Sequence, residues 1–192
     1  MKMTRFAEFI AHLKAWQVFL ALIAPMIALQ VFVVGMIAPS GQVGSIAETE
    51  LLRELAQRLI ILSFIMLLLL FAWLVSVALV SNNRINSSLR PSLRVYSAAM
   101  VYVLTYCALA VYFFPHYFSS RQGLPGPIVV MHLLATAANF YILGFTAKSL
   151  VLAQKQSAVS FFDYAGAFFL MWFFPVGVWF VQPRVNKLGS AV

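Results

Sequence analysis

The sequence predicts an all-α protein, a polytopic transmembrane helical bundle of about five spans, and three observations lead to it. Of the 192 residues, 63% are hydrophobic and only 9% are charged, whereas a soluble domain has about 45–50% apolar and about 25% charged residues. The mean hydropathy is +0.93. Apolar runs of about 20 residues, enough to cross a bilayer, recur along the chain. A chain of this length forms a single integral membrane domain with no separate soluble enzyme domain.

The distribution of charge and the cysteine content exclude several other classes of protein. The formal net charge is +8, and the thirteen Lys and Arg residues are scattered beside apolar runs, which is typical of residues that orient membrane helices. The lipid bilayer, and not nucleic acid, is therefore the predicted partner. Cys107 is the only cysteine and lies inside an apolar run, which excludes a disulfide framework and a cysteine-based metal site.

Residues 4–17 predict an amphipathic helix that lies in the headgroup region of the bilayer. The apolar side chains recur at helical spacing, and the charged ones lie off that stripe. This helix either fixes the angle of the first span, which we favour, or senses lipid. The first span covers residues 18–38, where Pro25 is placed to produce a kink. This apolar run exceeds the hydrophobic region of a signal peptide, so we expect it to be retained as a span.

The second span, residues 59–80, is predicted to belong to a helix longer than the membrane. Ser45 and Glu48 have the spacing of a capping box, and helical periodicity continues from there to Val80. Such a helix has roughly 35 residues and a length of about 50 Å at 1.5 Å per residue. Its charged first part is predicted to project beyond the bilayer, either as a solvated face, which we favour, or as a docking surface.

The third and fourth spans are predicted over residues 95–114 and 128–152. A polar connector, residues 81–92, precedes the third span, with Pro91 placed for its first turn. We expect that span to end at Pro115. Residues 119–127 contain two glycines and two prolines and predict a non-helical loop. The fourth span is followed by a short connector, residues 153–159.

The last apolar segment, residues 161–182, has two alternative predictions. Ser160 and Asp163 have the spacing of a helix start, and Pro175 and Gly177 interrupt the run that follows. Its length favours a crossing with a kink, and this is our preferred interpretation. The proline and the charge bias favour a re-entrant hairpin, which other spans would have to shelter.

Basic residues predict the orientation of the chain. The N-terminal arm, the second connector and the fourth connector hold eight Lys and Arg residues, and the first and third connectors hold three. An excess of Lys and Arg marks the cytoplasmic side, so the N-terminus is predicted to be cytoplasmic. Arg184 and Lys187 make the count eight inside and five outside if the last segment crosses, and ten against three if it turns back.

Polar side chains form one stripe on the third span and another on the fourth. If the two spans are antiparallel neighbours, these stripes can meet and hydrogen-bond, at about 0.6 kcal/mol per bond; this is the interpretation we favour. The alternatives are a pore or proton relay lined by the stripes, or a haem or quinone site at His116 and His132. The stripes consist of Tyr102, Thr105, Tyr106, Tyr112 and His116, and of His132, Thr136, Asn139 and Thr146.

Asp163 is the only acidic residue inside or bordering a predicted span. We expect its carboxylate to cap the last helix, because a helix N-terminus stabilises negative charge. The alternative is an ion pair with Lys148 or Lys155 that fixes the fourth span to the last segment. The sequence contains no Ser, His and Asp set, no HExxH, no phosphate-binding glycine loop and no carboxylate pair, so the chain is predicted to be non-enzymatic, without metal or cofactor.

The last part of the chain contains the pattern Phe-Phe-Pro-x-Gly-x-Trp-x-x-Gln-Pro-Arg-x-Asn. It resembles the C-terminal signature of a family of small, uncharacterised bacterial polytopic membrane proteins. The resemblance covers about the last seventh of the 192 residues. It implies a multi-pass protein of the bacterial inner membrane and supplies no activity. The positions that carry it are Asp163, Pro175, Gly177, Trp179, Gln182, Pro183, Arg184 and Asn186.

These observations predict a non-enzymatic membrane protein that acts through assembly. It would form a homo-oligomer or serve as an accessory subunit of a membrane complex. A small oligomeric pore or transporter lined by the polar stripes is the first alternative, and a haem- or quinone-binding redox subunit is the second. The sequence does not specify a transported species, a partner or an oligomeric state.

Overall fold

The computed structural model describes residues 5–37, 46–119 and 125–190, and within them the side chains of residues 5–28, 30–31, 58–112 and 125–190. These residues form helices and no strand, which confirms the all-α prediction. The helices are α1 (Arg5–His12), α2 (Ala15–Ile37), α3 (Ile46–Arg84), α4 (Leu93–Ser119), α5 (Gly126–Lys155), α6 (Phe161–Trp172) and α7 (Phe174–Ser190).

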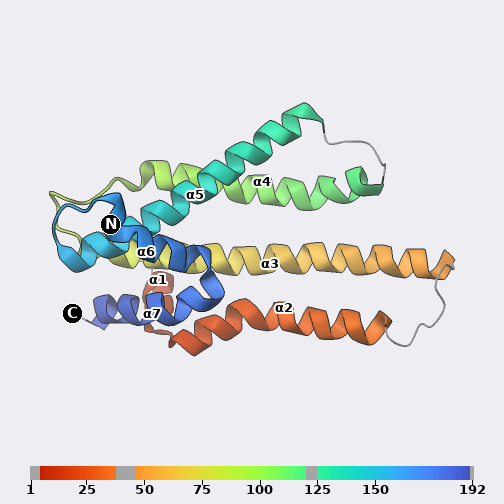
Figure 1. Ribbon diagram of the computed structural model, residues 1–192, viewed down its shortest axis with the longest axis horizontal. Helices are drawn as coiled ribbons and strands as arrows, with labels where there is room; N and C mark the ends of the chain where they lie inside the picture. The colour runs from red at the N-terminus through yellow and green to blue at the C-terminus, as the bar shows by residue number, and fades with distance from the viewer. Residues whose placement is uncertain (1–4, 38–45, 120–124, 191–192) are drawn as a thin grey trace.

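The long helices lie side by side, and the prediction of a polytopic membrane bundle is confirmed (Figure 1). Three helical stretches are long and apolar enough to cross a membrane, namely Arg58–Arg84, Leu93–Tyr112 and Gly126–Lys155. A fourth is obtained if α1 and Ala15–Ala28 are taken as one broken span, bent by 101°.

The N-terminal arm is helical as predicted, but it is divided. α1 ends at His12 and α2 begins at Ala15, so the single helix expected over residues 4–17 is wrong. The amide of Lys14 donates to Oε1 of Gln17 at 2.8 Å, which is half of a capping box at the start of α2. Because this bond supplies a partner to an amide at the new helix start, the chain can turn sharply there.

The second predicted helix is one continuous element. α3 has 39 residues, which corresponds to about 58 Å, and it ends at Arg84 instead of Val80. The side chains of Ser45 and Glu48 and of the predicted projecting part lie outside the described residues. The capping box and the docking surface therefore stay predictions.

Two boundaries differ from the prediction. α4 continues through Pro115 to Ser119, because a proline removes only one backbone hydrogen bond and apolar surroundings penalise leaving the helix. Gly126 and Pro127 were expected in a loop but belong to the first turn of α5, where a missing amide hydrogen costs nothing. α5 ends at Lys155 and is capped by Gln156, whose φ of 51° is left-handed and whose amide donates to the Leu152 carbonyl at 2.9 Å.

The last segment does not cross the bundle, so the favoured prediction of a kinked crossing is wrong and the hairpin is found instead. α6 and α7 fold back on each other beside α3 (Figure 1). Val159, before α6, and Leu188, near the end of α7, both pack against the small cluster of Ile85, Leu152 and Ala153. The two ends of the segment therefore lie at the same end of the bundle.

This end, which we call the basic end, holds Lys14, Arg84, Arg90, Lys155 and Lys187. It also holds most of the core, because the buried side chains concentrate in the last part of α3, the last part of α5 and α7. The opposite end, which we call the far end, has fewer buried side chains among the described residues. Among the described side chains, the packing is therefore densest at the basic end.

Candidate functional site

The turn between α6 and α7 is the most unusual piece of backbone in the described residues. The Phe173 amide donates to the Phe169 carbonyl at 2.9 Å, and the Phe173 carbonyl accepts from the amide of Gly177 at 2.9 Å. Phe173 therefore ends one helix and starts the next. Pro175 lies in the first turn of α7, where its missing amide hydrogen is tolerated. The proline predicted to kink a span instead starts a new helix.

The same turn leaves backbone carbonyls without their usual helical partners. The Met171 carbonyl would accept from residue 175, but Pro175 has no amide hydrogen. The Trp172 carbonyl would accept from Val176, whose amide donates to the Phe173 carbonyl at 3.0 Å instead. The carbonyls of Met171 and Trp172 at the carboxyl end of α6 thus receive no amide from α7.

Gly177 permits the close approach of the two helices. A Cβ atom built at this position would lie 1.6 Å from the carbonyl oxygen of Leu170, far inside any allowed contact. This oxygen belongs to the backbone of α6, so it cannot move aside without opening the hairpin. Only glycine fits here, which gives a physical reason for the Phe-Phe-Pro-x-Gly part of the C-terminal pattern.

The turn lies near the middle of the membrane-spanning helices. The ring of Trp172 packs at 4.4 Å, centroid to centroid, on Phe140, which is about halfway along α5. Trp172 is 44% exposed and Phe173 is 63% exposed. A backbone break with an exposed surface therefore lies level with the middle of α5, one of the helices that are long and apolar enough to cross a membrane.

Gln182 anchors α7 to two other parts of the chain. Its side chain is fully buried, and its Oε1 accepts from Nε1 of Trp73 on α3 at 2.9 Å. Its Nε2, which carries two hydrogens, lies within hydrogen-bonding distance of three acceptors: the carbonyls of Ile10 at 2.9 Å and Leu13 at 3.0 Å, and Oδ1 of Asn186 at 2.9 Å. Gln182 thus supplies a partner to the Leu13 carbonyl just after α1, and a second donor to the Ile10 carbonyl, which also accepts from the Leu13 amide at 3.2 Å.

Neighbouring residues of the pattern support this anchor. Asn186 donates from Nδ2 to the Leu13 carbonyl at 3.1 Å. The ring of Trp179 packs on Phe19 of α2 with centroids 5.5 Å apart. Pro183 is exposed, and Arg184 is half-buried. The structure therefore gives Gln182, Asn186 and Trp179 contacts that join α7 to the first two helices.

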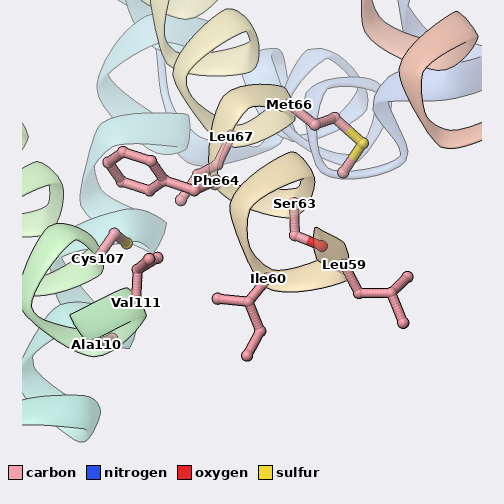
Figure 2. Close-up of a pocket in the computed structure, with 9 residues that line it drawn as sticks. All are labelled: Leu59, Ile60, Ser63, Phe64, Met66, Leu67, Cys107, Ala110 and Val111. Atoms are coloured by element: carbon pink, nitrogen blue, oxygen red, sulfur yellow. The ribbon is translucent and has the colours of Figure 1, made fainter. Parts of the chain in front are cut away.

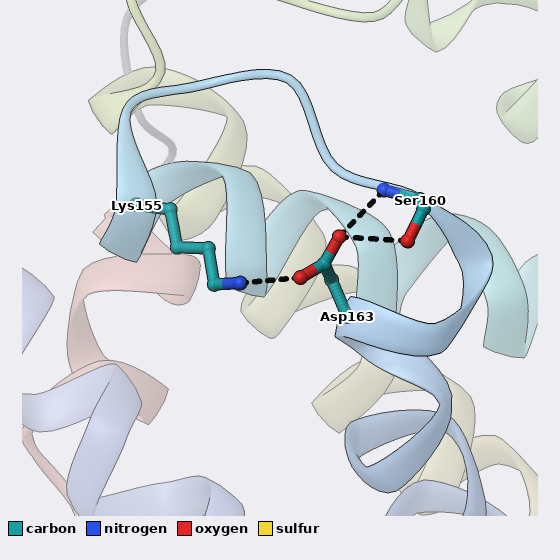
Figure 3. A network of polar contacts seen from close by, with 3 residues as sticks. All are labelled: Lys155, Ser160 and Asp163. Carbon is teal, nitrogen blue, oxygen red and sulfur yellow. Dashed lines mark hydrogen bonds and ion pairs between the residues drawn. The ribbon is translucent and has the colours of Figure 1, made fainter.

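Asp163 combines the two roles that the sequence left as alternatives. Its Oδ2 accepts from the amide and the hydroxyl of Ser160, both at 2.8 Å, which forms the predicted cap. Its Oδ1 accepts from Nζ of Lys155 at the end of α5 (Figure 3). Lys155, and not Lys148, is the ion-pair partner. The hydrogen bond from Lys155 and those from Ser160 lower the pKa of Asp163 from 3.8 to about 2.

The polar stripes of α4 and α5 meet, as predicted. The hydroxyl of Tyr106 and Nδ1 of His132 lie 2.8 Å apart, and the hydroxyl of Tyr102 donates to the Met131 carbonyl at 3.0 Å. Thr136 donates to the His132 carbonyl at 2.9 Å within its own helix. The bonds of Tyr106 and Tyr102 join α4 to α5, as the interhelical interpretation requires.

Other stripe residues do not join the two helices. The side chain of Asn139 is half-buried and makes no hydrogen bond with any residue that the structure describes. The side chain of His116 lies outside the described residues, so the paired-histidine cofactor site stays a prediction. Within the described side chains, no group of three or more His, Cys, Asp and Glu residues has the geometry to hold a metal ion.

Sequence reasoning missed several functional partners. Trp73 is fully buried and holds Gln182, but its indole is one more apolar side chain in a long apolar run. Ser81, Asn82 and Ser149 are buried, and one side-chain atom of each has no hydrogen-bond partner among the described residues. The one available signal was that Ser149 is a polar side chain inside an apolar run.

Fold and contacts define a polytopic helical membrane protein whose C-terminal segment is a re-entrant hairpin. Comparison of the chain with known protein families, with curated proteins and with solved structures finds no match. The resemblance of the C-terminal pattern to a bacterial membrane family therefore stays a prediction, and function has to be argued from the site.

Proposed function

We propose that this protein is a non-enzymatic membrane protein that acts through assembly, either as a homo-oligomer or as an accessory subunit of a membrane complex. The single observation that carries the proposal is the turn at Phe173. It combines exposed aromatic rings, a break in the helix and two carbonyls without helical partners, at membrane depth. A second subunit that covers this turn would bury the exposed rings and could donate hydrogen bonds to these carbonyls.

The energetic argument concerns the carbonyls of Met171 and Trp172. In a hydrocarbon environment each unsatisfied backbone group costs several kcal/mol. Lipid chains offer no hydrogen-bond donor, whereas a polar side chain from a neighbouring subunit does. Trp172 and Phe173 also present large, rigid aromatic surface, which is enriched at protein interfaces. Covering the turn with protein is therefore more favourable than leaving it in lipid.

We place this assembly in the bacterial inner membrane with the basic end in the cytoplasm. The hairpin returns Arg184 and Lys187 to the basic end, which gives the count of ten basic residues against three. This is a stronger bias than a crossing segment would give, and the side rich in Lys and Arg is the cytoplasmic one. The bacterial assignment rests on the C-terminal pattern alone.

A photocrosslinking experiment tests the proposal. Benzoylphenylalanine would replace Phe173 in the full chain, expressed in membranes with two differently tagged copies of the protein. The matched control would replace Val130 of α5, which is 57% exposed and lies away from the turn. We expect a crosslinked protein product at position 173 and none at 130.

The mass and tags of the product decide between the two forms of assembly. A product with both tags identifies a homo-oligomer, and a product with one tag and an added mass identifies another subunit. If position 173 gives only lipid adducts or unreacted monomer, as position 130 should, the proposal is wrong. The pore and the redox subunit have no comparable support, because the polar groups of Tyr106 and His132 are paired with each other.

A further inference from the structure

The first helix, α1, presents three separate sides to its surroundings. Ala7 and Ala11 are buried, and the helix packs against α3 and α7. A Cβ atom built at Gly189 of α7 would lie 3.5 Å from the Cβ of Ala11. Phe6 and Phe9 are 53% and 62% exposed. The polar residues of the helix are exposed as well, and they are Arg5, Glu8 and His12.

Helical geometry keeps these three sides apart. At about 3.6 residues per turn, Ala7 and Ala11 share one side, Phe6 and Phe9 share a second, and the polar residues lie on a third. A helix at a membrane surface places its apolar side toward the acyl chains and its polar side toward water. The alanine side of α1 leaves room for protein as the third neighbour.

The orientation of α1 agrees with a place at the membrane surface. Its axis makes an angle of 101° with that of Ala15–Ala28, the first part of α2, which runs beside α3 (Figure 1). The stretch Arg58–Arg84 of α3 is long and apolar enough to cross a membrane. A helix nearly perpendicular to these two therefore lies nearly in the membrane plane.

The depth of α1 agrees with the same place. The Ile10 carbonyl of α1 lies 2.9 Å from Nε2 of Gln182. Phe173 at the hairpin turn precedes Gln182 by nine residues, or about 13.5 Å along the helix axis. The turn lies level with the middle of α5, and half of a hydrocarbon core is about 15 Å. With the turn at the middle of the membrane, α1 lies at the edge of the hydrocarbon.

We propose that Phe6 and Phe9 insert among the acyl chains of the leaflet at the basic end, so that the partner of this side of α1 is lipid. Apolar rings are unfavourable in water. A helix of eight residues is about 12 Å long, and two rings on it offer far less surface than the roughly 800 Å² per partner that a stable protein interface buries. This inference does not depend on the assembly proposed above, because it leaves open whether a subunit covers the turn at Phe173.

Collisions of a spin label with two relaxation reagents test the proposal. Oxygen concentrates in hydrocarbon, whereas a neutral nickel chelate stays in water. The full chain with a nitroxide label at Phe9→Cys, or at Glu8→Cys as the matched control, would be placed in vesicles of phosphatidylethanolamine and phosphatidylglycerol. We expect oxygen to relax the label at position 9 more than the nickel chelate does, and the opposite order at position 8, one residue away on the polar side.

The native cysteine has to be removed for this measurement. Cys107 lines a groove between α3 and α4, where it faces Phe64 (Figure 2), and Cys107→Ala provides the background for each labelled variant. Phe6→Cys, on the same side of α1 as Phe9, should repeat the result at position 9. Circular dichroism should show the same helix content in all the labelled variants.

Two results would overturn the inference. One is a label at position 9 that the nickel chelate relaxes as strongly as it does at position 8, which would place this side of α1 in water. The other is a label at position 9 that is shielded from both reagents, which would mean that protein covers this side. Dipolar broadening between labels would then identify that protein as a second copy of the chain.

Discussion

Replacing Gln182 with leucine should unfold the chain more easily than any other single change of a polar side chain in α7. Leucine has nearly the same size but neither donates nor accepts a hydrogen bond. The substitution removes the hydrogen bonds that the buried amide makes with Trp73, Ile10, Leu13 and Asn186. The Leu13 carbonyl keeps its bond from Asn186, and the Ile10 carbonyl keeps its bond from the Leu13 amide at 3.2 Å. The indole of Trp73 and Oδ1 of Asn186 are therefore the two groups left without a partner.

The magnitude follows from these two groups. A buried donor or acceptor that loses its partner costs about 1–3 kcal/mol, so the two together cost about 2–6 kcal/mol. Some relaxation of the α1–α2 turn offsets part of this. We expect the Gln182→Leu variant to lose about 2–4 kcal/mol of unfolding free energy, most of it through weaker docking of α7 on α1 and α3.

The assay is reversible unfolding of the full chain in mixed micelles, followed by circular dichroism. Gln154→Leu is the matched control, because Gln154 is exposed on α5 and its change should stay within about 0.5 kcal/mol. A double-mutant cycle with Trp73→Phe should give a coupling energy of about 1 kcal/mol or more. A Gln182→Leu variant as stable as the control, with no coupling to Trp73, would refute the reasoning.

Three further changes test the other contacts. Gly177→Ala should destabilise the fold by about 3 kcal/mol or more, because the new methyl group collides with the backbone of α6, whereas Gly166→Ala, with open space around it, should be neutral or stabilising by up to about 1 kcal/mol. Asp163→Asn should abolish the acid sensitivity of the melting temperature between pH 4 and pH 2. The pKa of Asp163 is lowered from 3.8 to about 2. The stabilisation by its carboxylate is therefore present above the ordinary carboxyl pKa and is lost as the pH falls through this range. Tyr106→Phe should cost about 0.6 kcal/mol in the same micelle assay, through loss of the bond to His132.

Each of these expectations has a contradicting result. Equal stability of the two glycine variants would show that the hairpin is looser than the contact with Leu170 requires. An acid transition unchanged in Asp163→Asn would assign it to other carboxylates, and Lys155→Gln should reproduce the Asp163 effect. A stability loss in Tyr106→Phe no larger than in Tyr141→Phe would mean that the bond between α4 and α5 contributes nothing.

Much of the fold could be predicted from sequence because it depends on local signals. The apolar runs predict a helical chain that spans a membrane. Ser160 and Asp163, which are three residues apart, have the spacing of a helix start. The lysine partner of Asp163 was one of two predicted candidates, since Lys148 and Lys155 are the bases in and just after the preceding span. Antiparallel neighbours joined by a short connection also led to the meeting of Tyr106 with His132.

The hairpin could not be chosen on the same grounds. Residues 161–182 are long enough to cross, and a proline inside such a run reads equally well as a kink or as a new first turn. The hairpin depends on the close packing of Gly177 against the backbone of Leu170, and no local sequence pattern predicts this contact between two helices. The partners of Gln182 are carbonyls about 170 residues earlier in the chain, and periodicity contains no information about them.

The bond between Gln182 and the end of α1 has a consequence for biosynthesis. The Leu13 carbonyl receives a donor that is translated 169 residues later, which takes on the order of 10–30 s at about 5–20 residues per second. During that interval the first helix emerges from the ribosome without the amide that will hold it. The contact between α1 and α7 therefore forms late in the synthesis of these residues, and the interval before it is when membrane chaperones and proteases find the bundle incomplete.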